Sequence, residues 1–270
     1  MPAEQSLREG KIEETLAQLQ EQVRKDPSNA KHRVFLFQLL TILGDWKRAM
    51  TQLSVLKDLD ASTIPMTQAY AEAVKCEALR ADIFAGGRSP LVFGEPEQWI
   101  ALMAEALRLG ADGKHGKAQE LRGQALESAP ATAGTIDGAA FEWIADADSR
   151  LGPLLEAVVN GRYYWIPFHR ILRVDIEKPV DLRDIVWMPA HFAWSNGGEA
   201  VGLIPTRYPG SETSEDSQIR MARKTDWIGA EGDTWLGLGQ RMLATDAGEY
   251  PLMAVREIRL ETAAEPGEGA

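Results

Sequence analysis

The segment from residue 34 to residue 43 restricts the fold of this chain more than any other stretch. It reads Val-Phe-Leu-Phe-Gln-Leu-Leu-Thr-Ile-Leu and lies between charged residues at 31–33 and a Gly-Asp-Trp turn at 44–46. Ten residues are long for a strand, and the flanking pattern is helical, so the segment predicts a buried helix. A surface helix is apolar along one stripe only, whereas this one is apolar nearly all round. Both of its sides must therefore be covered, by the protein's own helices or by a partner.

Glycines at the ends of helical segments recur with a spacing that indicates a repeat. Gly10 and Gly44 lie 34 residues apart, the segments after them match, and a third copy begins at Gly113. A small residue, Ala49 or Ala118, stands five positions after the second and third glycines. A period of this length with a glycine turn is similar to the tetratricopeptide repeat, in which antiparallel helix pairs stack. Residues 1–135 are therefore expected to form a tetratricopeptide-like (TPR-like) helical domain, with helices at about 31–43, 46–59 and 66–85.

Beyond residue 130 the pattern changes from helical to alternating, and residues 131–138 are expected to be a linker. The segments 154–159 and 162–166 flank Asn160-Gly161, a sequence typical of a tight β-hairpin turn. Further strands are expected at 171–176, 185–194, 200–204, 219–228, 235–244 and 255–260. Helices followed by strands predict a multidomain α+β chain. The β-rich, mostly antiparallel domain is expected at 136–261, and a disordered tail at 262–270.

Composition and charge exclude several classes of function. The net charge of -11 and the pI near 5.0 argue against a nucleic-acid binder and against adhesion to an anionic membrane. Cys76 is the only cysteine, so an internal disulfide and a cysteine-based zinc cluster are excluded. No apolar run approaches the ~20 residues that span a bilayer, and residues 1–10 lack the apolar core of a signal peptide. We expect a cytoplasmic protein without a nucleic-acid or membrane partner.

Candidate catalytic and metal-binding residues are few, and a structural role is favoured for each. Asp146 and Asp148 form an Asp-x-Asp pair that could hold a metal, but this spacing is also common in turns. His169 and His191 lie in the β-rich region outside any metal-ligand spacing. Residues 237–242 carry two glycines of a dinucleotide fingerprint but not the third. We expect no catalytic residue, no metal and no cofactor; the alternative is an enzyme whose site combines the two aspartates and the two histidines.

The helix predicted at 31–43 has more apolar surface than a helix pair needs. In the repeat register its packing stripe is Arg33, Leu36, Phe37 and Leu40, and the remaining apolar side chains are surplus. Either the chain's own packing covers this surplus, or it forms a groove that takes an amphipathic helix of another protein. The residues predicted to bind such a partner helix are Val34, Phe35, Gln38, Leu39, Thr41 and Ile42.

Several longer motifs between residues 7 and 260 point to one family. They are Phe-Leu-Phe-Gln-Leu-Leu at 35–40, Pro-Leu-Val-Phe-Gly-Glu-Pro at 90–96, Phe-Glu-Trp-Ile-Ala-Asp-Ala-Asp-Ser-Arg-Leu-Gly-Pro at 141–153, Asn-Gly-Arg-Tyr-Tyr-Trp-Ile-Pro at 160–167 and Ile-Pro-Thr-Arg-Tyr-Pro-Gly-Ser at 204–211. On these motifs the chain resembles the ImpE/TagJ family of type VI secretion accessory proteins. The resemblance implies a cytoplasmic, non-enzymatic adaptor that binds the N-terminal helix of the small contractile-sheath subunit. It also implies a part in sheath assembly or recycling with the ClpV ATPase, which the adaptor would serve indirectly.

Overall fold

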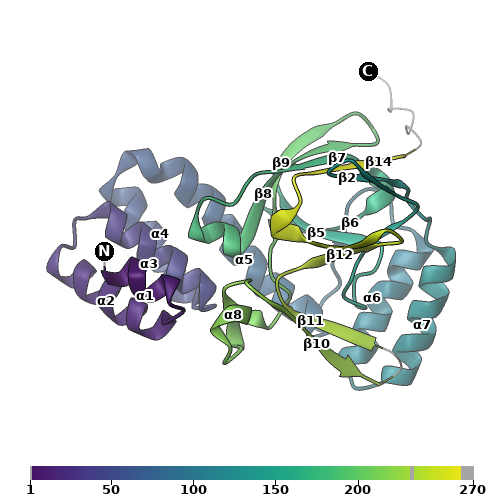
Figure 1. Ribbon diagram of the computed structural model, residues 1–270, viewed down its shortest axis with the longest axis horizontal. Helices are drawn as coiled ribbons and strands as arrows, with labels where there is room; N and C mark the ends of the chain where they lie inside the picture. Colours follow the sequence, from purple (N-terminus) through teal and green to yellow (C-terminus); the bar gives the residue numbers. More distant parts are fainter. Residues whose placement is uncertain (1, 232–233, 263–270) are drawn as a thin grey trace.

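The computed structural model describes residues 2–231 and 234–262. Within these ranges the chain is α+β, with helices first and a mostly antiparallel sheet region after them (Figure 1). This order of classes was predicted from the sequence and is confirmed. Residues 263–270, which belong to the predicted disordered tail, lie outside the described residues.

The helical half begins at the N-terminus and ends at residue 128. Its elements are α1 (Pro2–Arg8), α2 (Ile12–Lys25), α3 (Ala30–Ile42), α4 (Trp46–Leu59), the 3₁₀ turn η1 (Ala61–Thr63), α5 (Ile64–Phe84), α6 (Gln98–Ala111) and α7 (His115–Ser128). The helices predicted at 31–43, 46–59 and 66–85 are confirmed to within two residues as α3, α4 and α5. In the part of the chain that the structure describes, no helix is long and apolar enough to pass through a membrane.

The three glycines of the predicted repeat end α1, α3 and α6 in the same way. Gly10, Gly44 and Gly113 have φ angles of 78°, 68° and 75°, a region that residues with a side chain rarely adopt. At each glycine its N–H and the next N–H bond to carbonyls of the preceding helical turn, which is the Schellman ending. Ala49 and Ala118, five positions after two of these glycines, are both buried. The chain thus reverses direction between paired helices where the sequence predicted it.

A nine-stranded sheet forms the β-rich half, with the strand order β1-β6-β5-β9-β8-β7-β14-β2-β3. Its strands are β1 (Leu91–Val92), β2 (Gly134–Ile136), β3 (Ala139–Phe141), β5 (Leu154–Val159), β6 (Arg162–Pro167), β7 (Ile171–Ile176), β8 (Trp187–Trp194), β9 (Glu199–Pro205) and β14 (Glu257–Leu260). Neighbouring strands are antiparallel except for β1 and β6.

Two smaller sheets and several short helical segments complete the described fold. One sheet contains β4 (Ile144–Asp146), β12 (Met242–Thr245) and β13 (Gly248–Pro251), and the other pairs β10 (Thr225–Ala230) with β11 (Thr234–Gly239). The short segments are η2 (Phe168–Arg170), η3 (Leu182–Ile185), η4 (Ser211–Thr213), α8 (Ser217–Arg220) and η5 (Leu252–Ala254).

The predicted hairpin is confirmed, whereas two other predictions are wrong. Asn160 and Gly161 have φ angles of 50° and 73° between β5 and β6, as a tight hairpin turn requires. The strand predicted at 219–228 starts only at Thr225, because its first residues complete α8 and a turn. The linker predicted at 131–138 contains β2 and the turn to β3. Strands of three residues show too little alternation to be recognised in a sequence.

Buried apolar side chains form three clusters, and two of them contain side chains from both halves. One lies within the β-rich half, and one lies among α1–α5 together with Val186, Trp187 and Met221. The third joins the end of α5, α6 and α7 to β5 and β6. All six residues of β5 are buried because the strand packs against different clusters on its two faces. The domain boundary at residue 135 therefore stays a prediction.

Candidate functional site

A groove of about 760 Å³ lies beside the N-terminal half of α3. The α3 side of the groove consists of Ala30, Lys31, Val34, Phe35 and Gln38, which share one helical face. The other walls come from α1, from the junction of α4 and η1, from η3 with the loop before it, and from the residues after α8. The apolar members of these walls are Leu7, Val180, Leu182, Ile185 and Met221.

Short-range hydrogen bonds hold the wall at η3 in place. Asp181 and Asp184 form a capping box at the start of η3, which satisfies backbone donors at this turn. The guanidinium of Arg183 lies 4.7 Å from the centre of the Tyr70 ring and attaches η3 to α5. Val180 is consequently held at the rim of the groove, where 88% of it is exposed. Together with Leu182 and Ile185, Val180 extends the apolar lining of the groove, and contiguous apolar surface of this kind is typical of a binding site.

Three of the six residues predicted to bind a partner helix line this groove, and three do not. Those that line it are Val34, Phe35 and Gln38. The expectation that Leu39, Thr41 and Ile42 belong to a free surface is wrong, because all three are 0% exposed. Partner binding by any of the six stays a prediction.

The C-terminal half of α3 is sealed because other elements contact it on all sides. It packs against α2, α4 and η3. Its end is closed by Arg207, whose Nη1 donates to the carbonyl oxygen of Ile42 at 2.9 Å and whose Nη2 donates to that of Thr41 at 3.3 Å. Carbonyls at a helix C-terminus lack the full set of partners inside the helix, and Arg207 supplies a buried donor to both of these. The apolar surplus seen in the sequence is therefore mostly internal packing, and only the first turns of α3 remain open.

A second group of residues, which we call the buried charge cluster, joins α5 to the sheets. It consists of Arg80, Asp146, Glu156 and Arg241, none of which is more than 5% exposed. Arg80 donates from Nε to Glu156 Oε1 at 2.6 Å and from Nη2 to Oε2 at 3.0 Å. Arg241 pairs with both Glu156 and Asp146. Buried charges are tolerated when they are paired and hydrogen-bonded, so this cluster is a structural connection.

The two carboxyl groups of the buried charge cluster have opposite pKa shifts. Burial alone would raise the pKa of Glu156, but Arg80 and Arg241 lower it to about 2. Burial raises the pKa of Asp146 to about 6, an effect that Arg241 opposes and the nearby Asp148 reinforces. Carboxyls with separated pKa values also occur in acid–base enzymes. Here both are sealed from solvent, so neither can reach a substrate in this conformation.

The two aspartates of the alternative enzyme site are occupied by structural partners. Asp146 accepts a hydrogen bond from the Tyr208 hydroxyl at 3.1 Å besides its pairing with Arg241. Asp148 pairs with Arg150, with 2.5 Å between Nη2 and Oδ2, and accepts from the N–H of Gly237 at 2.8 Å. The Asp-x-Asp pair is thus part of a hydrogen-bonded turn.

The two histidines lie apart from these aspartates, each beside other carboxylates. His169 Nε2 is 3.0 Å from Oε1 of Glu97, and His191 Nε2 is 3.4 Å from Oε2 of Glu199. Among the described residues, no group of three or more His, Cys, Asp or Glu side chains could hold a metal ion. The four residues of the alternative enzyme site are therefore not brought together.

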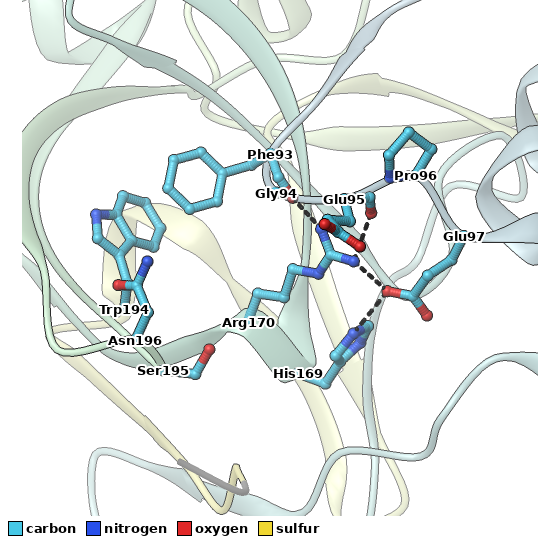
Figure 2. A pocket seen from close by; sticks show the side chains of 10 residues that line it. All are labelled: Phe93, Gly94, Glu95, Pro96, Glu97, His169, Arg170, Trp194, Ser195 and Asn196. Carbon is cyan, nitrogen blue, oxygen red and sulfur yellow. Dashed lines mark hydrogen bonds and ion pairs between the residues drawn. The ribbon is translucent and has the colours of Figure 1, made fainter. Parts of the chain in front are cut away.

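A second pocket, of about 780 Å³, lies between the loop at residues 93–97 and the turn after β8 (Figure 2). Arg170 extends towards this loop and donates to the carbonyl oxygens of Phe93 and Glu95 at 2.6 and 2.5 Å and to the Glu97 carboxylate at 2.6 Å. The Phe93 ring lies 4.2 Å from that of Trp194. The charged guanidinium is thus engaged in fixing the loop that carries the 90–96 motif.

Sequence reasoning missed the residues that connect the two halves. The 204–211 motif supplies one of them, Arg207, which closes α3. Its neighbours Thr206 and Tyr208 bond to Asp184 at 2.6 Å and to Asp146 within the β-rich half. A signal for the cluster was present in Glu156, the only charged residue in the apolar run at 154–159. A carboxylate in the middle of a buried strand requires a cation opposite it.

Comparison with known proteins agrees with the family resemblance of the sequence. Residues 138–259 match the family model of the ImpE protein. A Pseudomonas aeruginosa protein described as "Type VI secretion system accessory component TagJ" is 49% identical over 261 residues, which are 97% of this chain and 92% of that relative. A crystal structure of protein VPA1032 from Vibrio parahaemolyticus has the same fold, with a TM-score of 0.88, 25% identity and coverage of 97% of this chain and 98% of that one. The chain therefore belongs to the ImpE/TagJ family of type VI secretion accessory proteins.

Proposed function

We propose that this protein is a non-enzymatic, cytoplasmic adaptor that docks the N-terminal helix of the small sheath subunit in the groove beside α3. The Pseudomonas relative is described as an accessory component of the type VI secretion system, and the family resemblance implies the sheath subunit as partner. In this role the adaptor assists sheath assembly or recycling, and the ClpV ATPase acts on the captured sheath protein. The ionisable groups of the alternative enzyme site are engaged with structural partners, which favours the adaptor over an enzyme.

The observation that carries this proposal is the difference between the two ends of α3. The C-terminal half is fully covered, whereas Val34 and Phe35 are only half-buried and face a groove with apolar walls. From Ala30 to Gln38 the helix spans about 12 Å at 1.5 Å per residue. A docked helix of about two turns fits this length and would present apolar side chains at positions i, i+3 or i+4 and i+7.

We further propose that the helical half consists of TPR-like pairs. The shared glycine endings of α1, α3 and α6 and the buried Ala49 and Ala118 support this relationship. Stacked helix pairs leave a concave side that commonly accepts a partner segment. A groove on α3, the leading helix of its pair, agrees with this mode of recognition.

A matched pair of substitutions at exposed valines tests the docking site. Val180 stands at the groove rim and Val201 on β9, and they are 88% and 70% exposed. Neither side chain supports the core, so Val180→Asp and Val201→Asp should both fold. We expect Val180→Asp to weaken binding of a sheath-helix peptide at least fivefold, because it places a charge beside an apolar contact, and Val201→Asp to leave it unchanged.

The measurement is isothermal titration of the full-length protein with a peptide of the sheath subunit's N-terminal helix. Far-UV circular dichroism checks that both variants keep the native helical content. Equal affinities for the two variants and the unchanged protein would exclude this groove as the docking site. Phe35→Asp should abolish binding altogether. If that variant unfolds, the comparison of Val180→Asp with Val201→Asp still tests whether the groove is the docking site.

A further inference from the structure

The charged residues of the groove are unevenly distributed along α3. Arg8 and Arg223 lie together, since Nη1 of Arg223 donates to the carbonyl oxygen of Arg8 at 3.4 Å. Neither guanidinium pairs with a carboxylate among the residues that the structure describes. Both residues line the groove, so two cations belong to the same part of its rim.

Arg8 and Arg223, which we call the basic corner, lie near the C-terminal end of α3. Arg207 donates both to the carbonyl of Ile42, the last residue of α3, and to the carbonyl of Arg220, three residues before Arg223. Arg220 in turn pairs with Glu13 in the first turn of α2, next to the end of α1. The end of α1, the residues after α8 and the end of α3 thus meet at one corner of the groove.

One acidic lining residue, Asp60, lies at the opposite end of the groove from this corner. Asp60 follows the last residue of α4, and α4 runs antiparallel to α3 after the turn at Gly44, so Asp60 lies near the start of α3. The contact between Arg33 Nη1 and Gln52 Oε1, at 3.0 Å, shows the same alignment. Apart from the two arginines, the charged lining residues are Glu4, Lys31, Asp60 and Asp181. Glu4 stands one helical turn before Arg8, Asp181 pairs with Arg183 at 2.7 Å, and Lys31 belongs to the first turn of α3, so the contrast between the two ends rests on the two arginines and on Asp60.

We infer that the docked helix lies parallel to α3, with its C-terminal end against Arg8 and Arg223 and its N-terminal end towards Asp60. This inference rests on the proposed docking function and adds the direction of the partner. A helix carries partial negative charge and unpaired carbonyls at its C-terminus, and partial positive charge at its N-terminus. Guanidinium groups donate to such carbonyls, and the reversed helix would place its unpaired N–H groups against the two cations. Complementary charge fixes orientation more strongly than affinity.

Disulfide cross-linking of the full-length protein tests the direction. Ser62→Cys introduces a thiol at the Asp60 end, and Lys224→Cys introduces one beside Arg223; both positions are exposed. The native Cys76 is buried and does not compete. The probes are two sheath-helix peptides, one with a cysteine at its N-terminus and one with a cysteine at its C-terminus. The N-terminal cysteine should cross-link to Ser62→Cys and the C-terminal cysteine to Lys224→Cys, each at about ten times the yield of the opposite pairing.

The opposite pattern overturns the inferred direction and leaves the docking site intact. Equal yields in all four pairings, with peptide binding retained, show that the groove fixes no direction and also overturn the inference. Failure of the peptide to bind the unchanged protein overturns the proposed function as well, so the two failures are distinguishable.

A charge reversal gives a second, independent measurement. Arg223→Glu should weaken peptide binding roughly three- to tenfold at low salt, and the difference should shrink as salt is added. Arg108→Glu, on the exposed surface of α6, is the matched control and should change nothing. An unchanged affinity in Arg223→Glu contradicts the inferred contact with the helix end.

Discussion

The groove beside α3 and the buried charge cluster under α5 differ in how completely their side chains are buried and paired. The cluster contains the groups most suited to chemistry, yet Arg80, Asp146, Glu156 and Arg241 pair with one another and are closed to solvent. The groove contains chemically plain side chains, such as Val34 and Phe35, that are only partly covered. In this chain, incomplete burial marks the candidate site better than titratable groups do.

The largest effect is expected when one cation is removed from the cluster. Arg80→Met leaves the Glu156 carboxylate, which is 0% exposed, without its bidentate partner. Breaking a buried ion pair on one side costs about 3–5 kcal/mol. Arg108→Met removes an exposed guanidinium that pairs with Glu105 and Asp112, where solvent screens the ion pairs and a much smaller loss of stability is expected. Urea unfolding of both variants measures the difference, and equal losses would refute a structural role for the cluster.

Two phenylalanines of α3 allow the same substitution on its open and its sealed side. Phe37 is 0% exposed in the core, whereas Phe35 is half-buried in the groove. Phe37→Ala should lower the free energy of unfolding by about 3–4 kcal/mol, and Phe35→Ala by about 1–2 kcal/mol, since less of its area is buried. Peptide binding by the folded protein should show the reverse order. If Phe37→Ala impairs binding more than Phe35→Ala does, the groove is not the docking site.

The cluster should also give stability a distinctive pH dependence. The pKa of Asp146 rises from its ordinary 3.8 to about 6 in the folded state, so the native protein binds this proton more tightly than the unfolded chain does. The resulting stability is present below about pH 4 and is lost as the pH rises through about 6. Between pH 4 and pH 7 the free energy of unfolding of the unchanged protein should therefore fall by on the order of 2–3 kcal/mol. Asp146→Asn should not show this fall.

The pKa shift of Glu156 has the opposite sign, so this residue affects stability in a different pH range. Its pKa of about 2 is below the ordinary 4.5, so its contribution is present above about pH 4.5 and is lost as the pH falls towards 2. The difference between the unchanged protein and Asp146→Asn in thermal or urea unfolding at pH 4, 5, 6 and 7 isolates Asp146, because Glu156 is present in both. Parallel pH profiles for Asp146→Asn and the unchanged protein would show that this carboxyl remains ionised throughout.

The smallest effects are expected at the two histidines. His169 and His191 are partly exposed and contact carboxylates at the surface. Their replacement by Gln should change stability by less than about 1 kcal/mol and should leave peptide binding unaltered. A marked loss of binding in His169→Gln would move attention from the α3 groove to the pocket of Figure 2.

The sequence predicted those parts of the fold that depend on local rules. Glycine turns, the helices α3 to α5 and the Asn160-Gly161 hairpin follow from backbone preferences and periodicity, which neighbouring residues alone determine. The short strands β2, β3 and β4 were missed because three residues carry almost no periodic signal. The strand predicted at 219–228 failed where α8 interrupts it, after the N-cap Asp216.

The candidate site was predicted only in part, because covering of a helix is a long-range property. The sequence identified α3 as a helix with surplus apolar surface, and it named Val34, Phe35 and Gln38 as partner-binding residues. It could not show that Leu39, Thr41 and Ile42 are covered, since the covering combines the neighbouring helices α2 and α4 with η3 and Arg207, which lie more than 130 residues later in the chain. A single sequence does not show which distant residues cover a given helix face.

The closure of α3 by Arg207 also sets the order of events during synthesis. The walls of the groove include residues 180–185 and Met221 and Arg223, so the ribosome must release most of the chain before the groove exists. A nascent or truncated chain that lacks these residues would expose the apolar surface of α3 and would have no complete groove. The proposed capture of a sheath helix therefore requires the β-rich half as well, and we expect an isolated helical half not to bind it.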